Sequence, residues 1–243
     1  MENIKVNKLE AAHRQLGVAI RLHFIDDDPC SVLTLAGAAA GVFADLVEKK
    51  APQEWWDKRA WEANGITRKA YFDAMRLGQN FLKHADKDPD DTLEWTAADT
   101  ESLIFFAILN AGEVGGNSPS EQVFQLWYFA TRSHQFSSDF EPAALALEYF
   151  PGIMEMTDLK RREFGTARLT QELQSPSMNK RQYPIAHFSP NPLIDPWVAQ
   201  MQALDLRNRR RVLIRRPGVG PRPLYLYKYF SSDRPIHMTI FVT

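Results

Sequence analysis

The stretch DPCSVLTLAGAAAGVFADLVEKK, from Asp28 to Lys50, decides the fold. Asp28 followed by Pro29 is typical of a helix N-cap and the first helical position, where the missing N–H of proline has no consequence. The helix that follows is apolar nearly all round, and such a helix belongs in the middle of a bundle. Gly37 and Gly41 lie four residues apart, which indicates the close approach of a neighbouring helix. We therefore expect this helix at the centre of a helical bundle.

Helix signals flank this segment on both sides. Asn7 is placed to cap a first helix, and Glu10 three residues later completes a pattern like a capping box. Pro52 opens a tryptophan-rich segment, and a further amphipathic helix is predicted from Thr67 to Asp86. No strand alternation appears in residues 1–174, so the sequence predicts an all-α bundle of about six to eight helices. The remaining helices are expected to begin after Thr96, Ser118, Glu141 and Thr157.

The charge distribution divides the chain into two regions. Residues 1–174 hold 18 Lys+Arg and 27 Asp+Glu, whereas residues 175–243 hold 11 Lys+Arg, 3 Asp and no glutamate. The second region also contains 9 of the 15 prolines, which prevents a long helix at its start. This change predicts an α-helical domain over 1–174 and a basic, Pro/Arg-rich C-terminal extension over 175–243.

Two interpretations of the extension stay open. Its arginines, among them Arg209, Arg210 and Arg211, suit the phosphates of a nucleic acid, so the extension could be a nucleic-acid-binding arm. The same composition also fits a segment with no selected fold. The β-prone runs 224–230 and 238–242 favour a short β-hairpin if the extension does fold.

The densest set of side chains able to do chemistry lies in RLGQNFLKHADKDPDD, from Arg76 to Asp91. Arg76, Asn80 and His84 are spaced four residues apart, so they share one face of the predicted helix, with Lys83 beside them. A polar row of this kind could hold an anion. The alternative is that Lys83 and His84 are cations near a helix C-terminus, which the helix dipole favours.

The aspartates that follow resemble the start of a calcium loop. Asp86 and Asp88 stand at early ligand positions, but Asp91 replaces the glycine that the sharp turn needs, and Ala97 replaces the bidentate glutamate. An EF-hand is therefore excluded. Asp86 and Asp88 are left as binding candidates in a solvated turn, and no metal site is predicted.

Other function classes lack their signatures. The sequence has no P-loop, no dinucleotide-binding glycine pattern, no GxSxG and no HExxH, so we predict no cofactor. Cys30 is the single cysteine, which excludes an intramolecular disulfide and a multi-cysteine metal site. The charged N-terminus does not read as a signal peptide, and the longest uncharged run, Pro29–Ala44, is short for a membrane span. We expect a cytoplasmic protein without membrane contact.

Three stretches carry a family resemblance: KLEAAHRQLGVAIRLHF, DPCSVLTLAGAAAGVFADLVEKK and QNFLKHADKDPDDTLEW. Together they resemble a family of uncharacterised bacterial all-helical proteins over about residues 3–170. The motif Asn80-x-x-Lys83-His84 is also similar to motifs in HEPN-type helical domains, a resemblance that implies RNA cleavage and bacterial defence. The usual pattern of those domains places its arginine and histidine closer together than the seven residues that separate Arg76 from His84.

Two functions follow as hypotheses. The first is a non-catalytic binding or regulatory module that meets a protein partner, or a second copy of itself, through its Trp-rich or acidic surface. The second is a HEPN-like enzyme that processes nucleic acid. In that enzyme Arg76 would hold phosphate, Asn80 would orient the substrate and His84 would act as acid and base.

Overall fold

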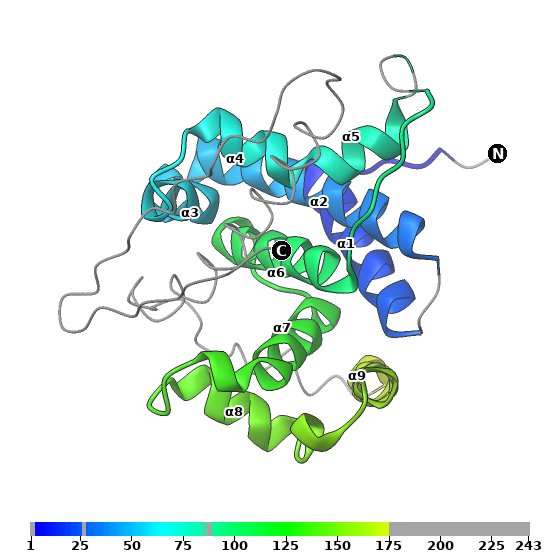
Figure 1. The fold of residues 1–243 in the computed structure, drawn as a ribbon, viewed down its shortest axis with the longest axis vertical. Helices are drawn as coiled ribbons and strands as arrows, with labels where there is room; N and C mark the ends of the chain where they lie inside the picture. Colours follow the sequence, from blue (N-terminus) through cyan, green and yellow to red (C-terminus); the bar gives the residue numbers. More distant parts are fainter. Residues whose placement is uncertain (1–2, 26–27, 85, 87–88, 175–243) are drawn as a thin grey trace, which may run out of the picture.

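The computed structural model describes residues 3–25, 28–84, 86 and 89–174, and these form nine α-helices, three short 3-10 helices and no strand (Figure 1). The predicted all-α class is therefore confirmed for this part of the chain. The predicted hairpin, Asp88 and the three arginines at 209–211 lie outside the described residues. The helices are α1 (Lys8–Phe24), α2 (Pro29–Lys50), α3 (Trp56–Ala63), α4 (Arg68–Met75), α5 (Leu77–Lys83), α6 (Ala97–Val114), α7 (Pro119–Thr131), α8 (Glu141–Tyr149) and α9 (Asp158–Gln174).

The sequence predicts α2 at the centre of the whole bundle, but that place belongs to α6, in which every residue from Thr100 to Ala111 is buried. Helix α2 lies at the centre of the N-terminal half. It packs most extensively against α1 and α6, while α7, α8 and α9 form a second group on the far side of α6 (Figure 1). Ala36, Ala39 and Phe43 have no exposed surface. By length and composition alone α2 could cross a membrane, and buried core helices of soluble proteins meet the same criterion.

The helix starts follow the capping signals in the sequence. The Asn7 side chain accepts a hydrogen bond from the backbone N–H of Glu10 at 2.9 Å, and Asp28 accepts one from the N–H of Ser31 at 2.8 Å. Thr96 and Ser118 each form a capping box with the acidic residue three positions on. Such caps satisfy N–H groups that the first helical turn cannot pair internally.

The helix predicted over 67–86 is divided into α4 and α5 by a bend at Arg76. The bend lets α5 lie directly on α2. A methyl group added at Gly78 would lie 2.6 Å from a Leu33 methyl carbon, and one added at Gly37 would lie 2.9 Å from the Gln79 Cβ. The close approach predicted at Gly37 is thus confirmed, whereas Gly41 has nothing within 4 Å. Because one predicted helix is divided in two, the described residues form nine α-helices, one more than the upper end of the predicted six to eight.

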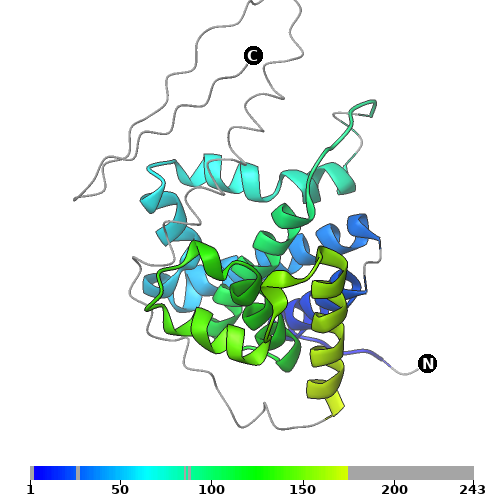
Figure 2. The same ribbon diagram turned by 60° about the horizontal axis from the view of Figure 1, so that its bottom comes forward.

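Helix α9, the last described helix, runs along one side of the bundle (Figure 2). Gly165 lies against the Phe24 ring, where any side chain would collide with it. Beside this contact, the Thr166 hydroxyl donates to the backbone oxygen of Phe24 at 3.1 Å. The Trp127 indole N–H of α7 donates to the backbone oxygen of Arg161 at 2.8 Å. These contacts fix α9 against α1 and α7.

Candidate functional site

The predicted catalytic residues lie at the solvent-exposed end of α5 and at the bend before it. The Arg76 guanidinium lies 4.6 Å from the centre of the Phe72 ring and 4.0 Å from an Asp45 carboxylate oxygen. Asn80 and His84 are exposed, and His84 has extended backbone because α5 ends there. Backbone hydrogen bonds of the helix join Asn80 to Arg76 at 2.8 Å and His84 to Asn80 at 3.1 Å, but among the described residues no side-chain hydrogen bond or ion pair links the three. Their catalytic role stays a prediction.

Two predicted binding residues of the same stretch, Lys83 and Asp86, are described by the structure and are also exposed. Lys83 Nζ lies 2.6 Å from the Gln79 amide oxygen when that amide is oriented to accept from the Ala38 N–H as well. Asp86 is exposed in the turn after α5. Over the described ranges, no group of three or more His, Cys, Asp or Glu side chains is placed to hold a metal ion.

A cleft lies elsewhere, where the C-terminal end of α1 and the first turns of α2 and α6 meet α9. Its volume of about 360 Å³ is near the lower end of the range typical of small-molecule sites. The cleft is assembled from three stretches that are distant in the sequence, residues 23–32, residues 93–100 and Arg162, so only the folded bundle creates it. Its walls are formed by His23, Pro29, Val32, Leu93, Glu94, Trp95, Ala97, Thr100 and Arg162.

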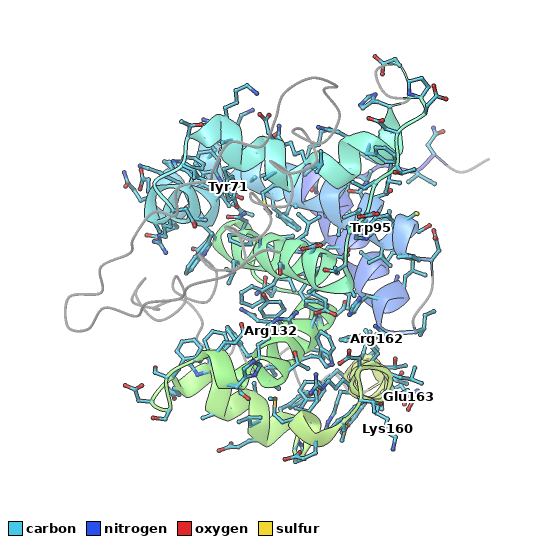
Figure 3. All side chains as sticks on the ribbon, viewed as in Figure 1. Tyr71, Trp95, Arg132, Lys160, Arg162 and Glu163 are labelled. Carbon is cyan, nitrogen blue, oxygen red and sulfur yellow. The ribbon has the colours of Figure 1, made fainter. Side chains whose placement is uncertain are left out.

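The walls of the cleft combine charged, polar and apolar groups. His23 and Thr100 are buried, and Arg162 is half-buried. Figure 3 shows Arg162 on the side of α9 that faces α1, whereas Lys160 lies on the outer side of that helix. Trp95 lies on the same side of the molecule as Arg162 (Figure 3). A small ligand in this cleft would therefore meet both polar groups and an indole ring.

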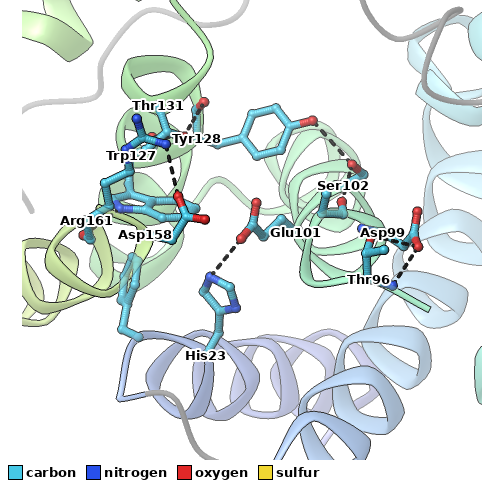
Figure 4. Close-up of polar contacts among 12 residues, drawn as sticks. His23, Thr96, Asp99, Glu101, Ser102, Trp127, Tyr128, Thr131, Asp158 and Arg161 are labelled. Carbon is cyan, nitrogen blue, oxygen red and sulfur yellow. Dashed lines mark hydrogen bonds and ion pairs between the residues drawn. The ribbon is translucent and has the colours of Figure 1, made fainter. Parts of the chain in front are cut away.

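Behind His23 the bundle encloses a line of ionisable side chains. His23 Nε2 lies 3.5 Å from one Glu101 carboxylate oxygen, and Arg132 Nη2 contacts the other. The side chains are 6% exposed for His23 and 11% exposed for both Glu101 and Arg132. Figure 4 shows His23 reaching from α1 to Glu101 on α6. The three residues form what we call the buried ionic line, and it ends at the cleft.

The far end of the buried ionic line is closed by an aromatic ring. The Arg132 guanidinium lies 3.9 Å from the centre of the Tyr128 ring, a geometry that favours a cation–π interaction. Burial raises the pKa of Tyr128 above its usual value, although Arg132 opposes the rise. The Tyr128 hydroxyl is therefore neutral near pH 7 and lies 3.4 Å from the Ser102 hydroxyl. Arg132 is held from both sides, by Glu101 and by this ring.

A second buried polar group joins α3, α4 and α6. The Asp57 carboxylate accepts hydrogen bonds from the Trp55 indole at 2.9 Å, the Tyr71 hydroxyl at 2.7 Å and the Asn110 amide at 2.7 Å. Burial raises the pKa of Asp57, and these three donors oppose the rise. Because its donors come from different segments, Asp57 acts as a structural junction. Figure 3 labels Tyr71 on α4 above α6, where its ring meets Phe106.

The residues of the buried ionic line were not predicted from the sequence as functional. One signal was available: Glu101 begins the run ESLIFFAIL, where a charge enters an otherwise apolar helix. A buried charge in such a place requires a partner. The sequence does not indicate that His23 and Arg132 are those partners, because three different helical segments supply the three side chains.

No protein-family model, curated protein or solved structure matches this chain. The resemblances to a bacterial helical family and to HEPN-type domains therefore stay predictions.

Proposed function

We propose that the helical domain is a non-catalytic binding module whose cleft takes a small molecule with an anionic group. The observation that carries this proposal is the buried ionic line, which ends at the cleft wall in His23. This is the non-catalytic binding module that the sequence favours, with a small-molecule cleft in place of a Trp-rich or acidic surface for a protein partner.

The charges of Glu101 and Arg132 lie inside the bundle, where each side chain is only 11% exposed. A buried ion pair gives little net stability, since the loss of hydration offsets most of the attraction between the partners. Arg132 and Glu101 are therefore poorly explained by stability alone. Their effect on His23 is more specific, because a carboxylate held in place by Arg132 fixes the imidazole next to it. An oriented ionisable group in a cleft is a common feature of binding sites.

The anionic preference rests on Arg162, on His23 and on two helix starts. Helices α2 and α6 both begin at the cleft, and their dipoles place partial positive charge there. The first-turn N–H groups are partly engaged by caps such as Asp28, so side chains rather than backbone would hold the anion. Glu94, which is exposed, would repel a second negative group of the ligand placed next to it. Val32, Leu93 and Trp95 would cover the apolar part of the ligand.

A ligand panel with two matched variants tests the proposal. Acetate, succinate, benzoate, phosphate and adenosine monophosphate would be titrated by isothermal calorimetry into the wild type, Arg162→Gln and Lys160→Gln. Both variants remove one positive charge from α9, but only Arg162 lines the cleft. We expect at least one panel member to bind the wild type and Lys160→Gln equally, and Arg162→Gln at least about tenfold more weakly, the loss typical of a charge-assisted hydrogen bond.

Two results would count against the cleft. Equal affinity of Arg162→Gln and the wild type would remove Arg162 from the site, and failure of the whole panel to bind would reject an anion-binding cleft of this size. The other sequence-based predictions stand apart from this proposal: a protein partner or self-association, nucleic-acid contact through the basic extension, a cytoplasmic location and the HEPN-like activity.

A further inference from the structure

A second surface feature, independent of the cleft, surrounds the guanidinium of Arg68. Its Cζ lies 4.9 Å from the centre of the Trp55 ring, 5.9 Å from that of Trp61 and 5.6 Å from that of Phe72. The Arg68 side chain remains 53% exposed. Three aromatic rings thus lie around one cation near α3 and α4, and Trp55 among them is only 5% exposed. We call Trp55, Trp61 and Phe72 the α3–α4 cage.

The rings of the α3–α4 cage are held by contacts beneath them. Trp55 and Trp61 meet almost perpendicularly, with ring centres 5.0 Å apart and an interplanar angle of 87°. The Trp55 indole N–H is fixed by the buried Asp57 carboxylate, and Trp61 contacts Tyr71 with ring centres 5.9 Å apart. The rings also contact one another, with centres 6.1 Å apart for Trp55 and Phe72 and 5.9 Å apart for Trp61 and Phe72, so their arrangement does not depend on Arg68. The cage is preorganised for a cation.

An acidic group completes the α3–α4 cage. The two Glu48 carboxylate oxygens accept from the two Arg68 terminal nitrogens at 2.7 and 2.8 Å. Glu48 comes from α2, whereas the three rings come from residues 55–72. Aromatic walls with a carboxylate beside them favour organic cations whose charge is spread over methyl groups.

We propose that the α3–α4 cage binds a quaternary or methylated ammonium group, with Arg68 as an internal occupant that competes for it. Arg68 is half exposed, so a cation from solvent can reach the rings, but it has to displace Arg68 and its two-point ion pair with Glu48. An incoming trimethylammonium group has no N–H to bind Glu48, so its affinity depends on the rings. Removing Arg68 would therefore strengthen binding, whereas removing a ring would weaken it.

Titration of the full chain with tetramethylammonium chloride, followed by tryptophan fluorescence, tests this proposal. Sodium chloride at matched ionic strength is the reference. We expect Arg68→Ala to bind at least about fivefold more tightly than the wild type, the factor that corresponds to about 1 kcal/mol for one exposed cation–π contact. Arg59→Ala is the matched control, because Arg59 lies 4.7 Å from the Trp56 ring, outside the cage. It should bind as the wild type does.

Loss of a cage ring provides the opposite test. In the Arg68→Ala background, Trp61→Ala should reduce tetramethylammonium affinity at least about fivefold, and Phe72→Leu should do the same if Trp61→Ala does not fold. Choline and a trimethyllysine peptide then distinguish a free small molecule from a modified protein as the source of the group. Equal affinity of Arg68→Ala and the wild type, or a response no larger than that to sodium, would overturn the proposal. Neither result bears on the cleft.

Discussion

Glu101 and Arg132 lie 31 positions apart, and their side chains form an ion pair inside the described bundle with only 11% of each exposed. The pair joins the start of α6 to the C-terminal end of α7. Glu101 also contacts His23 of α1. This single carboxylate therefore links three helices that the sequence separates widely, and it does so behind the wall of the cleft.

Removing one member of this pair should destabilise the protein strongly. Arg132→Met leaves Glu101 buried without its main partner, and we expect a loss of about 3–5 kcal/mol in the free energy of unfolding. The double variant Arg132→Met with Glu101→Leu should recover most of that loss, since no unpaired charge remains. Urea denaturation measures all three proteins.

The exposed pair between Arg14 and Glu10 is the control for that experiment. Glu10→Gln should change the free energy of unfolding by no more than about 1 kcal/mol, because water screens the pair. If Arg132→Met were as mild as Glu10→Gln, the pair would be open to solvent in the native state. The double variant should in addition weaken any ligand held by His23, because it removes the side chain that orients the imidazole.

Two glycines of α2 should respond to alanine in opposite directions. Gly37→Ala places a methyl group 2.9 Å from the Gln79 Cβ, so α5 must shift, and we expect a loss of about 1–3 kcal/mol. Gly41→Ala meets nothing within 4 Å and should stabilise the helix by about 0.5–1 kcal/mol. Thermal and urea unfolding of both variants check the signs. A gain at Gly37 would show that α5 does not lie against α2.

Local signals in the sequence predict most of this fold. The helix starts are predicted well because a cap needs only a short sequence pattern: a side-chain oxygen accepts a hydrogen bond from the backbone N–H three residues later. This pattern is present at Asn7, Asp28, Thr96 and Ser118. The bend at Arg76 was not predicted. It accompanies the close fit of Gly78 against Leu33, a contact between helices far apart in the sequence. The apolar residues keep their helical spacing of 3.6 residues on both sides of the bend. The pattern over 67–86 therefore predicts one helix.

The candidate site could not be predicted for a related reason. The sequence favours Arg76, Asn80 and His84 because ionisable residues are dense in that stretch. At an exposed helix end, however, neighbouring ionisable residues do not point their side chains toward one common point. The cleft residues are sparse in the sequence and gather only when α1, α2, α6 and α9 pack together. Burial then matters more than density, since it determines which polar side chains are held in a fixed geometry.

The HEPN-like hypothesis makes a sharp prediction at His84. If His84 acts as acid and base, His84→Ala abolishes cleavage of single-stranded RNA while leaving stability within about 0.5 kcal/mol, because the side chain is exposed. From the geometry we expect no RNA cleavage by the wild-type chain. A gel assay with the full chain and His84→Ala measures this directly. Cleavage that disappears in His84→Ala would place the activity at α5 and contradict our expectation.

Asp57 should make the stability of the bundle depend on pH. Burial raises its pKa above the usual 3.8, so the folded state binds the proton more tightly than the unfolded chain does. The stability that the proton on Asp57 contributes is fully present below the pKa of Asp57 in the unfolded chain. It is lost as the pH rises through the pKa of Asp57 in the folded protein.

Comparison with a variant isolates this contribution of Asp57. Asp57→Asn cannot ionise, so its free energy of unfolding should rise relative to that of the wild type as the pH increases above about 4, with a slope of at most about 1.4 kcal/mol per pH unit. Urea denaturation of both proteins between pH 4 and pH 8 measures the difference, in which the shared titrating groups largely cancel. A difference of the opposite sign would mean that the hydrogen bonds from Tyr71, Asn110 and Trp55 outweigh burial and keep the carboxylate ionised.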